Sequence, residues 1–271
     1  MNGIVSLVRR SPLVSFFVVA YGLSWGVGVL LRGEPTGAFS PLFVGGPLLA
    51  AILITTRTDG RAGLRDLLHR LLRWQIAPGW YAVVLGLPVV IVAMAVGLNS
   101  VLGGAAPDWT KAPGLIQLAL LFAIFLVVPI AAPLGEELGW RGFALPRLLA
   151  GRSVLLASLI LGVLWAAWHL PVVLANPAVR PPAPFLLAVP PLAVLFTWIF
   201  LHTRDSVFIA LLFHAWYDLV LVYVLATLVP ADLERFLWAI AAVQWLAAVA
   251  VVIAARRQWL EGPQHVVPTF R

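Results

Sequence analysis

Cysteine is absent from this chain of 271 residues, so disulfide frameworks, thiolate metal sites and cysteine nucleophiles are all excluded. Charged residues are scarce too: they make up 11% of the chain and apolar residues 62%, against about 25% and about 45–50% in ordinary globular domains. A soluble fold of this length would need far more charge on its surface. The excess apolar surface must face lipid, and the sequence therefore predicts an integral membrane protein.

Acidic residues are fewer than basic ones, which gives the chain a formal net charge of +7. In a soluble chain such a charge would suggest a nucleic-acid partner. Here the arginines stand between apolar runs, and no basic and aromatic residues alternate in a patch. The positive-inside bias of membrane proteins accounts for the basic residues, so we predict no nucleic-acid partner.

Long apolar runs dominate what is present. A membrane-spanning helix needs about 20 mostly apolar residues, and eight segments meet this requirement. They are residues 13–31, 38–55, 79–102, 114–133, 153–174, 185–202, 206–229 and 235–255. The first run is longer than the apolar core of a signal peptide, about 7–15 residues, so we expect it to stay attached.

No stretch between the predicted spans is long enough to fold alone. We therefore predict one integral membrane domain over residues 1–271, with an all-α fold of about eight transmembrane helices. Its motif-bearing core is expected at about residues 114–220. Nothing in the sequence predicts an oligomeric state.

The distribution of basic residues predicts the orientation of the chain. With eight spans and a cytoplasmic N-terminus, four of the 18 lysines and arginines fall outside, namely Arg32, Lys111, Arg180 and Arg235. The others, including Arg141, fall inside, as the positive-inside rule expects. We therefore predict a multi-pass protein of the cell membrane, of the prokaryotic plasma membrane type, with both termini cytoplasmic.

The stretch 61–74 differs from the spans. Its leucines recur at three- and four-residue steps, and its arginines mostly lie off that stripe. This pattern is typical of an amphipathic helix that lies in the plane of the membrane interface. We expect it to anchor the chain to anionic lipid on the cytoplasmic side.

Charged side chains within the spans are few. Each costs at least about 2.5–3.5 kcal/mol on insertion scales, so those that persist usually face a polar interior. They occur at the end of the fourth span, late in the fifth and inside the seventh: Glu136, Glu137, Arg141, His169, His214 and Asp218. Because three separate spans carry them, we expect these groups to meet at one buried polar site.

The first motif is GEELGWRGF, residues 135–143. Glu137 and Arg141 are four residues apart, the favourable order and spacing for an ion pair on a helix. Glu136 points about 140° away from Arg141 on a regular helix, so it lacks that partner. Pro133 is expected to kink or restart the helix just before these residues. The alternative is a solvated helix end with an ordinary ion pair.

The other two motifs each place an imidazole one turn from a second group. Trp165 and His169 share a helix face, as do His214 and Asp218. A carboxylate one turn from an imidazole can orient the ring or fix its tautomer. Each histidine could instead have only a structural role.

In this order the three motifs resemble those of the CPBP family, which includes the type II CAAX prenyl endopeptidases and the bacteriocin-processing or Abi proteins. The resemblance covers roughly residues 114–220. Two departures stand out: Trp165 replaces the usual Phe, and Asp218 replaces the common Asn. An Asn amide can donate a hydrogen bond to an oxyanion, whereas an ionised Asp cannot. Asp218 is therefore either held protonated or orients His214.

The resemblance implies an intramembrane endopeptidase that acts on membrane-associated peptides or proteins, without a metal or other cofactor. It implies that Glu136, assisted by His169, activates a water molecule, and that His214 with Asp218 stabilises the oxyanion. Glu137 and Arg141 would support the base, with Trp165 as an aromatic wall. We expect this site to open toward the cytoplasmic side.

Three other functions remain open from the sequence. Glu136, His169, His214 and Asp218 are all acceptable ligands for zinc or iron, so a metal-dependent membrane hydrolase is one. A transporter or proton relay could use the same residues, although no convincing internal repeat supports it. A non-enzymatic membrane scaffold or immunity protein could keep them for structure.

Overall fold

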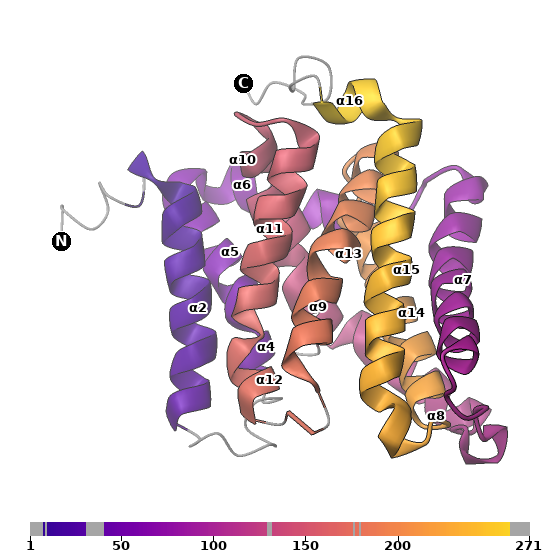
Figure 1. Cartoon of the computed structure of the whole chain (residues 1–271). Helices are drawn as coiled ribbons and strands as arrows, with labels where there is room; N and C mark the ends of the chain where they lie inside the picture. The colour runs from indigo at the N-terminus through magenta and orange to yellow at the C-terminus, as the bar shows by residue number, and fades with distance from the viewer. Residues whose placement is uncertain are drawn as a thin grey trace.

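The computed structural model describes residues 8, 10–30, 41–128, 132–175, 177–178 and 180–260. Within these ranges all regular structure is helical, and no strand is present. Figure 1 shows the long helices running side by side as one bundle. The predicted all-α class is therefore confirmed.

Five helical stretches are long and apolar enough to cross a membrane. They correspond to five of the eight predicted spans: α7 (Pro78–Val101), α11 (Val154–Trp168) followed by α12 (Leu170–Ala175), α13 (Pro182–His202), α14 (Val207–Leu225), and α15 (Leu233–Ala254) after the short 3₁₀ turn η3 (Pro230–Asp232). The first predicted span corresponds to α2 (Pro12–Leu30), of which Pro12–Gly26 is a shorter apolar helix.

The second predicted span, 38–55, is wrong as one continuous helix. Two helices, α4 (Pro41–Val44) and α5 (Gly46–Thr58), occupy its described part. Pro47 stands at the start of α5, where its missing N–H costs no helical hydrogen bond. Gly46 packs so tightly on α2 that a Cβ there would lie 2.7 Å from a backbone oxygen of that helix.

The fourth predicted span, 114–133, is also wrong as one helix. α8 (Leu115–Val127) has 13 residues, and a separate short helix, α9 (Ala132–Glu137), follows. Val128 has an extended backbone and precedes Pro129 in the sequence, and the residue before a proline disfavours the helical conformation. The two adjacent carboxylates therefore lie on a short helix of their own, which begins beside Pro133 as expected.

The amphipathic helix is confirmed as α6 (Gly60–Leu71), which directly follows α5. Leu67 is buried against the bundle, whereas Leu68 and Leu72 are exposed. Such exposed leucines on a helix with several arginines fit a position in the membrane interface.

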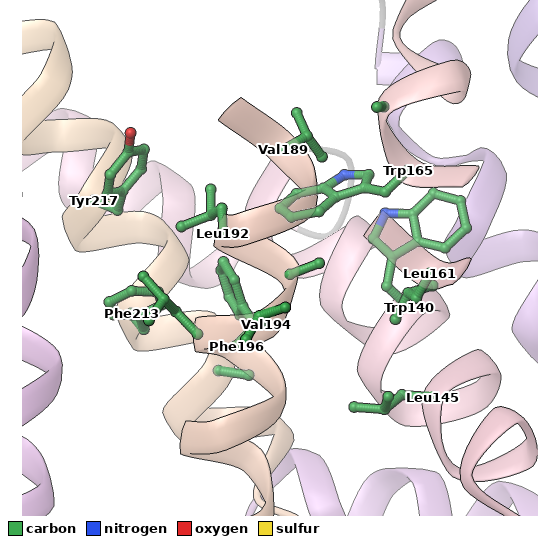
Figure 2. Close-up of a cluster of buried hydrophobic side chains, with 14 of the residues drawn as sticks. Trp140, Leu145, Leu161, Trp165, Val189, Leu192, Val194, Phe196, Phe213 and Tyr217 are labelled. Carbon is green, nitrogen blue, oxygen red and sulfur yellow. The ribbon is translucent and has the colours of Figure 1, made fainter. Parts of the chain in front are cut away.

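The core of the bundle is aromatic. α13 packs between α11 and α15 and against α14. Trp165 of α11, Phe196 of α13 and Phe213 of α14 are buried side chains of this core (Figure 2). The Phe196 ring contacts both of the others edge-on, at 5.6 Å from Trp165 and 4.8 Å from Phe213.

The two ends of the bundle differ in charge. One end holds α6, α10 (Leu145–Leu149) and α16 (Arg256–Leu260), with the described arginines at positions 10, 57, 61, 65, 70, 73, 147, 152, 204, 256 and 257. We call this the arginine-rich end. α12 lies at the opposite end, together with Arg180 in the connection to α13, Arg235 at the start of α15, and Lys111 in η1 (Trp109–Lys111). Arg32 lies outside the described residues.

Arg141 corrects one detail of the predicted orientation. It was assigned to a cytoplasmic connection, but its side chain is fully buried inside the bundle. Arg141 pairs there with Glu137 and packs on the rings of Trp165 and Phe196. Apart from Arg141, the basic residues remain unequally divided between the two ends of the bundle, as the positive-inside rule expects.

The orientation can be tested with single cysteines because the chain has none of its own. Arg61→Cys lies at the arginine-rich end and Ala178→Cys at the opposite end, and both positions are exposed. In intact bacterial cells, a membrane-impermeant maleimide should label Ala178→Cys at once and Arg61→Cys only after permeabilisation. The wild-type chain should stay unlabelled, and the reverse pattern would contradict the orientation.

Candidate active site

The segment that carries the two carboxylates has an unusual backbone. After α9, residues Leu138–Ala144 form the π-helix η2, and α10 continues from it. π-helical turns are rare and occur frequently at functional sites. Gly139 permits η2 to lie directly on the chain at the start of α5, because a Cβ there would be 2.9 Å from the backbone of Pro47. The break in the second predicted span thus makes room for this segment.

Glu136 is held by two tryptophans. Its side chain is 3% exposed, and its Oε2 accepts hydrogen bonds from Nε1 of Trp165 at 2.6 Å and Nε1 of Trp140 at 3.3 Å. Figure 2 shows these two indoles next to each other, one from α11 and one from η2. Both bonds go to the same oxygen, so they fix the carboxylate without engaging Oε1.

Glu137 takes the ion pair, as its spacing predicted. Its Oε1 accepts from Nη1 of Arg141 at 2.7 Å and from Nδ1 of His214 at 2.8 Å. The carboxylate and the guanidinium are both fully buried. Arg141 also lies over two aromatic rings, with its Cζ 4.4 Å from the Trp165 centroid and 3.8 Å from that of Phe196. Cation–π contacts of this kind strengthen when they are shielded from water.

His214 lies between two carboxylates. While Nδ1 bonds to Glu137, Nε2 is 3.6 Å from Oδ2 of Asp218, an ion-pair distance rather than a hydrogen bond. The ring packs edge-on against Trp165 and Phe196, at centroid distances of 5.5 and 5.4 Å. These contacts fix the plane of the imidazole.

His169 joins the group through Trp165. It caps the C-terminal end of α11, and its Nδ1 donates to the carbonyl oxygen of Trp165 at 2.9 Å. A carbonyl oxygen only accepts hydrogen bonds, so Nδ1 carries a proton and Nε2 of the neutral ring is an acceptor. Trp165 therefore links Glu136, through its indole, to His169, through its backbone.

Helix α2 supports this end of α11. The Trp25 indole donates to the carbonyl oxygen of Trp168 at 3.0 Å, and the Tyr21 hydroxyl donates to that of Leu164. Both accepting carbonyls lie within one turn of Trp165. The first helix of the bundle thus positions a residue far along the chain.

The structure thus brings all of the predicted site residues into one group: Glu136, Glu137, Arg141, Trp165, His169, His214 and Asp218. The sequence analysis missed Trp140 and Phe196. Trp140 follows Glu136 by four residues, a spacing that could have revealed it. No sequence signal marks Phe196, which reaches the group only through helix packing. In the described part of the chain, no three His, Asp or Glu side chains are arranged to hold a metal ion.

The side chains of the group differ in their exposure. Glu137 and Arg141 are fully buried, whereas His169 is half-buried and the Asp218 side chain is 30% exposed. His169 stands at the C-terminal end of α11, and Arg152 precedes the other end of that helix. On α14, which begins after Arg204, Asp218 lies one turn further along than His214. The opening of the site toward the cytoplasmic side stays a prediction.

The buried pair yields a stability prediction. Arg141→Met leaves the Glu137 charge buried with only His214 as partner, and breaking a buried ion pair costs about 3–5 kcal/mol. We expect a clearly lower unfolding midpoint for the protein in detergent, with partial recovery in the Glu137→Gln, Arg141→Met double variant. Arg147→Met is a matched control, because its half-exposed pair with Asp59 is worth only about 0–1 kcal/mol. Equal midpoints for the two single variants would contradict this account.

Comparison with known proteins agrees with this geometry. Residues 116–220 match the model of the type II CAAX prenyl endopeptidase Rce1-like family, nearly the stretch 114–220 predicted as the core. The chain is also 25% identical over 228 residues to CAAX prenyl protease 2 of Methanococcus maripaludis, which covers 78% of this chain and 83% of that protein. Members of the family are intramembrane peptidases. Over residues 116–220, this chain is similar to the Rce1-like type II CAAX prenyl endopeptidase family.

Proposed function

We propose that the protein is an endopeptidase that hydrolyses peptide bonds of membrane-associated peptides or proteins with a water molecule activated by Glu136. One observation carries the proposal: hydrogen bonds from Trp165 and His214 join the carboxylates of α9 to helices α11 and α14. Glu136 as a base and the imidazoles of His169 and His214 thus lie in one group within the bundle. This is the set of groups that hydrolysis of an amide requires.

Glu136 is the general base in this mechanism. It takes a proton from water while the water oxygen attacks the carbonyl carbon, and it returns that proton to the amine nitrogen as the C–N bond breaks. The indoles of Trp165 and Trp140 hold Oε2, so Oε1 is the oxygen directed to water. His169 assists through Nε2, since its Nδ1 is bonded to the Trp165 carbonyl. General-base help of this kind is typically worth about 10²–10⁴ in rate.

His214 stabilises the oxyanion. Its Nδ1 is bonded to Glu137, so the donor to a developing oxyanion is Nε2. The ring must then carry both protons, and the fully buried carboxylate of Glu137 balances that positive charge. One preorganised donor to an oxyanion typically contributes about 10²–10³ in turnover.

Arg141 and Asp218 are positioning residues. Arg141 holds Glu137, which in turn orients His214, although Arg141 itself is buried away from the open side. Asp218 lies 3.6 Å from Nε2 of His214, which favours an orienting role over donation by a protonated acid. We therefore propose the orienting role for the Asp that stands in place of the common Asn.

The central test is Glu136→Gln. The purified protein in lipid vesicles is incubated with a pool of membrane-tethered peptides, prenylated and not, and products are identified by mass spectrometry. Turnover should fall by at least about 10²–10⁴-fold in the variant, because a neutral amide cannot accept the proton. Glu234→Gln, the same change at an exposed residue of α15, should cleave like wild type.

Two results would count against this assignment. Near-normal cleavage by Glu136→Gln with an unchanged unfolding midpoint would remove Glu136 as the base. Cleavage that is lost when a chelator is added to wild type, and restored by zinc, would favour the metal-dependent hydrolase instead.

Asp218 provides an independent test. Asp218→Asn should keep turnover within about tenfold of wild type, because the amide oxygen can accept the same contact from His214. Asp218→Leu, of similar size but without an acceptor, should lose about 10²-fold or more as the oxyanion donor loses its orientation. If Asp218→Asn were as inactive as Asp218→Leu, Asp218 would act as a charge or an acid, and the positioning role would be wrong.

A further inference from the structure

The amphipathic helix α6 packs on the π-helix η2, which follows the two carboxylates of the candidate site. Leu67 of α6 is buried, and its Cδ2 would lie only 3.2 Å from a Cβ at position 142. Gly142 belongs to η2 and is the neighbour of Arg141, so the missing side chain lets α6 lie directly on this segment. A shift of α6 would therefore also move η2.

The N-terminal end of α6 is joined to η2 by an ion pair. Asp59 stands between α5 and α6, and its Oδ2 is 2.6 Å from Nη2 of Arg147. The same guanidinium donates from Nη1 to the carbonyl oxygen of Phe143 at 3.1 Å and lies over the Phe143 ring, with its Cζ 3.7 Å from the centroid. Phe143 is part of η2, so α6 is linked to that segment at two points.

The C-terminal end of α6 is joined to α14. The carbonyl oxygen of Arg73, two residues after α6, accepts a hydrogen bond from Oγ of Ser206 at 2.6 Å, and Ser206 caps the N-terminal end of α14. Arg73 donates to the carbonyl oxygen of Arg204, and Arg204 donates to that of Gln75. Helix α14 carries His214, so α6 is tied to both segments that the Glu137–His214 hydrogen bond brings together.

A different face of α6 is exposed. Arg61, Arg65, Leu68 and Leu72 follow one another at steps of four, three and four residues, which places them on one side of the helix. All four side chains are exposed. Guanidinium groups bind phosphates, and leucines beside them enter the acyl region below the headgroups. This combination of positive charge and apolar surface fits an anionic membrane surface, because a dissolved anion would leave the leucines in water.

We propose that this exposed face of α6 binds anionic phospholipid headgroups, and that the binding raises the activity of the candidate site by holding η2 and α14 in place. The inference rests on the proposed peptidase function. Because Leu67 lies on another face, lipid can bind α6 while the helix stays packed on η2. Each arginine near an anionic surface contributes about fivefold in binding, so the two can shift the equilibrium toward this arrangement by up to about 25-fold.

The test compares vesicles of phosphatidylcholine with vesicles that also contain about 30 mol% phosphatidylglycerol. The substrate is a peptide of the membrane-tethered pool that carries no net charge, so that anionic lipid does not concentrate it. Values of kcat and KM are measured for wild type and for the Arg61→Gln, Arg65→Gln double variant. The Arg61→Lys, Arg65→Lys double variant keeps the charge. The Arg256→Gln, Arg257→Gln double variant removes two exposed arginines from α16 at the same end of the bundle.

For wild type, kcat should be about 5- to 25-fold higher in the vesicles with phosphatidylglycerol, with little change in KM. The Arg61→Gln, Arg65→Gln variant should lose this stimulation, whereas the lysine variant and the α16 variant should keep most of it. Leu67→Ala should also lose it, because it removes the contact with η2 and keeps both arginines.

Lipid binding is measured separately from cleavage. Leu68→Cys introduces the only cysteine of the chain, and an environment-sensitive fluorophore attached there reports whether this face enters the membrane. Its emission should shift to shorter wavelength when phosphatidylglycerol is present. The shift should vanish with Arg61→Gln, Arg65→Gln and persist with Leu67→Ala. Its persistence would show that Leu67→Ala still folds and binds lipid.

Other results would overturn the inference. Equal kcat of wild type in the two kinds of vesicle would show that lipid binding does not act on the site. Full stimulation of Arg61→Gln, Arg65→Gln, or an unchanged emission, would show that α6 is not the lipid-binding surface. Full stimulation of Leu67→Ala would exclude its contact with η2 as the link. If wild type cleaves no peptide although the emission still responds to phosphatidylglycerol, the proposed peptidase function is wrong and the lipid-binding surface stands.

Discussion

The carboxylate of Glu137 accepts hydrogen bonds from Arg141 on its own segment and from His214 on α14, and no part of it reaches the surface. A charge buried this deeply persists in a membrane bundle only with such partners, because an unpaired one costs several kcal/mol. The pair therefore fixes where η2 lies against α14. It also turns the neighbouring Glu136 toward α11, where the Trp165 indole donates to its carboxylate, as Trp140 of η2 does.

Much of the site could be predicted from the sequence because its pairs are local. Glu137 with Arg141, Trp165 with His169, and His214 with Asp218 are each four residues apart, so helical periodicity alone places each pair on one face. The cost of charge in lipid then requires the three pairs to meet. The same reasoning predicted the five long helices and α6, since lipid and its interface impose strong compositional patterns.

The rest depends on packing between segments, which composition does not record. The helix breaks after Val44 and Val127 lie inside apolar runs, so hydropathy alone does not reveal them. A proline follows each break within three residues. The π-helix η2 and its close approach to Pro47 follow from how that segment fits between its neighbours. Phe196 covers Arg141 only because α13 crosses the site, a contact that no spacing within one helix encodes.

The break after α8 also places the two carboxylates inside the bundle. Because α8 stops after 13 residues, the carboxylates stand on a short segment within the protein, and Arg141 beside them packs on the rings of Phe196 and Trp165. His169 and Asp218 remain partly accessible. The positive-inside rule predicts that the arginine-rich end is the cytoplasmic one.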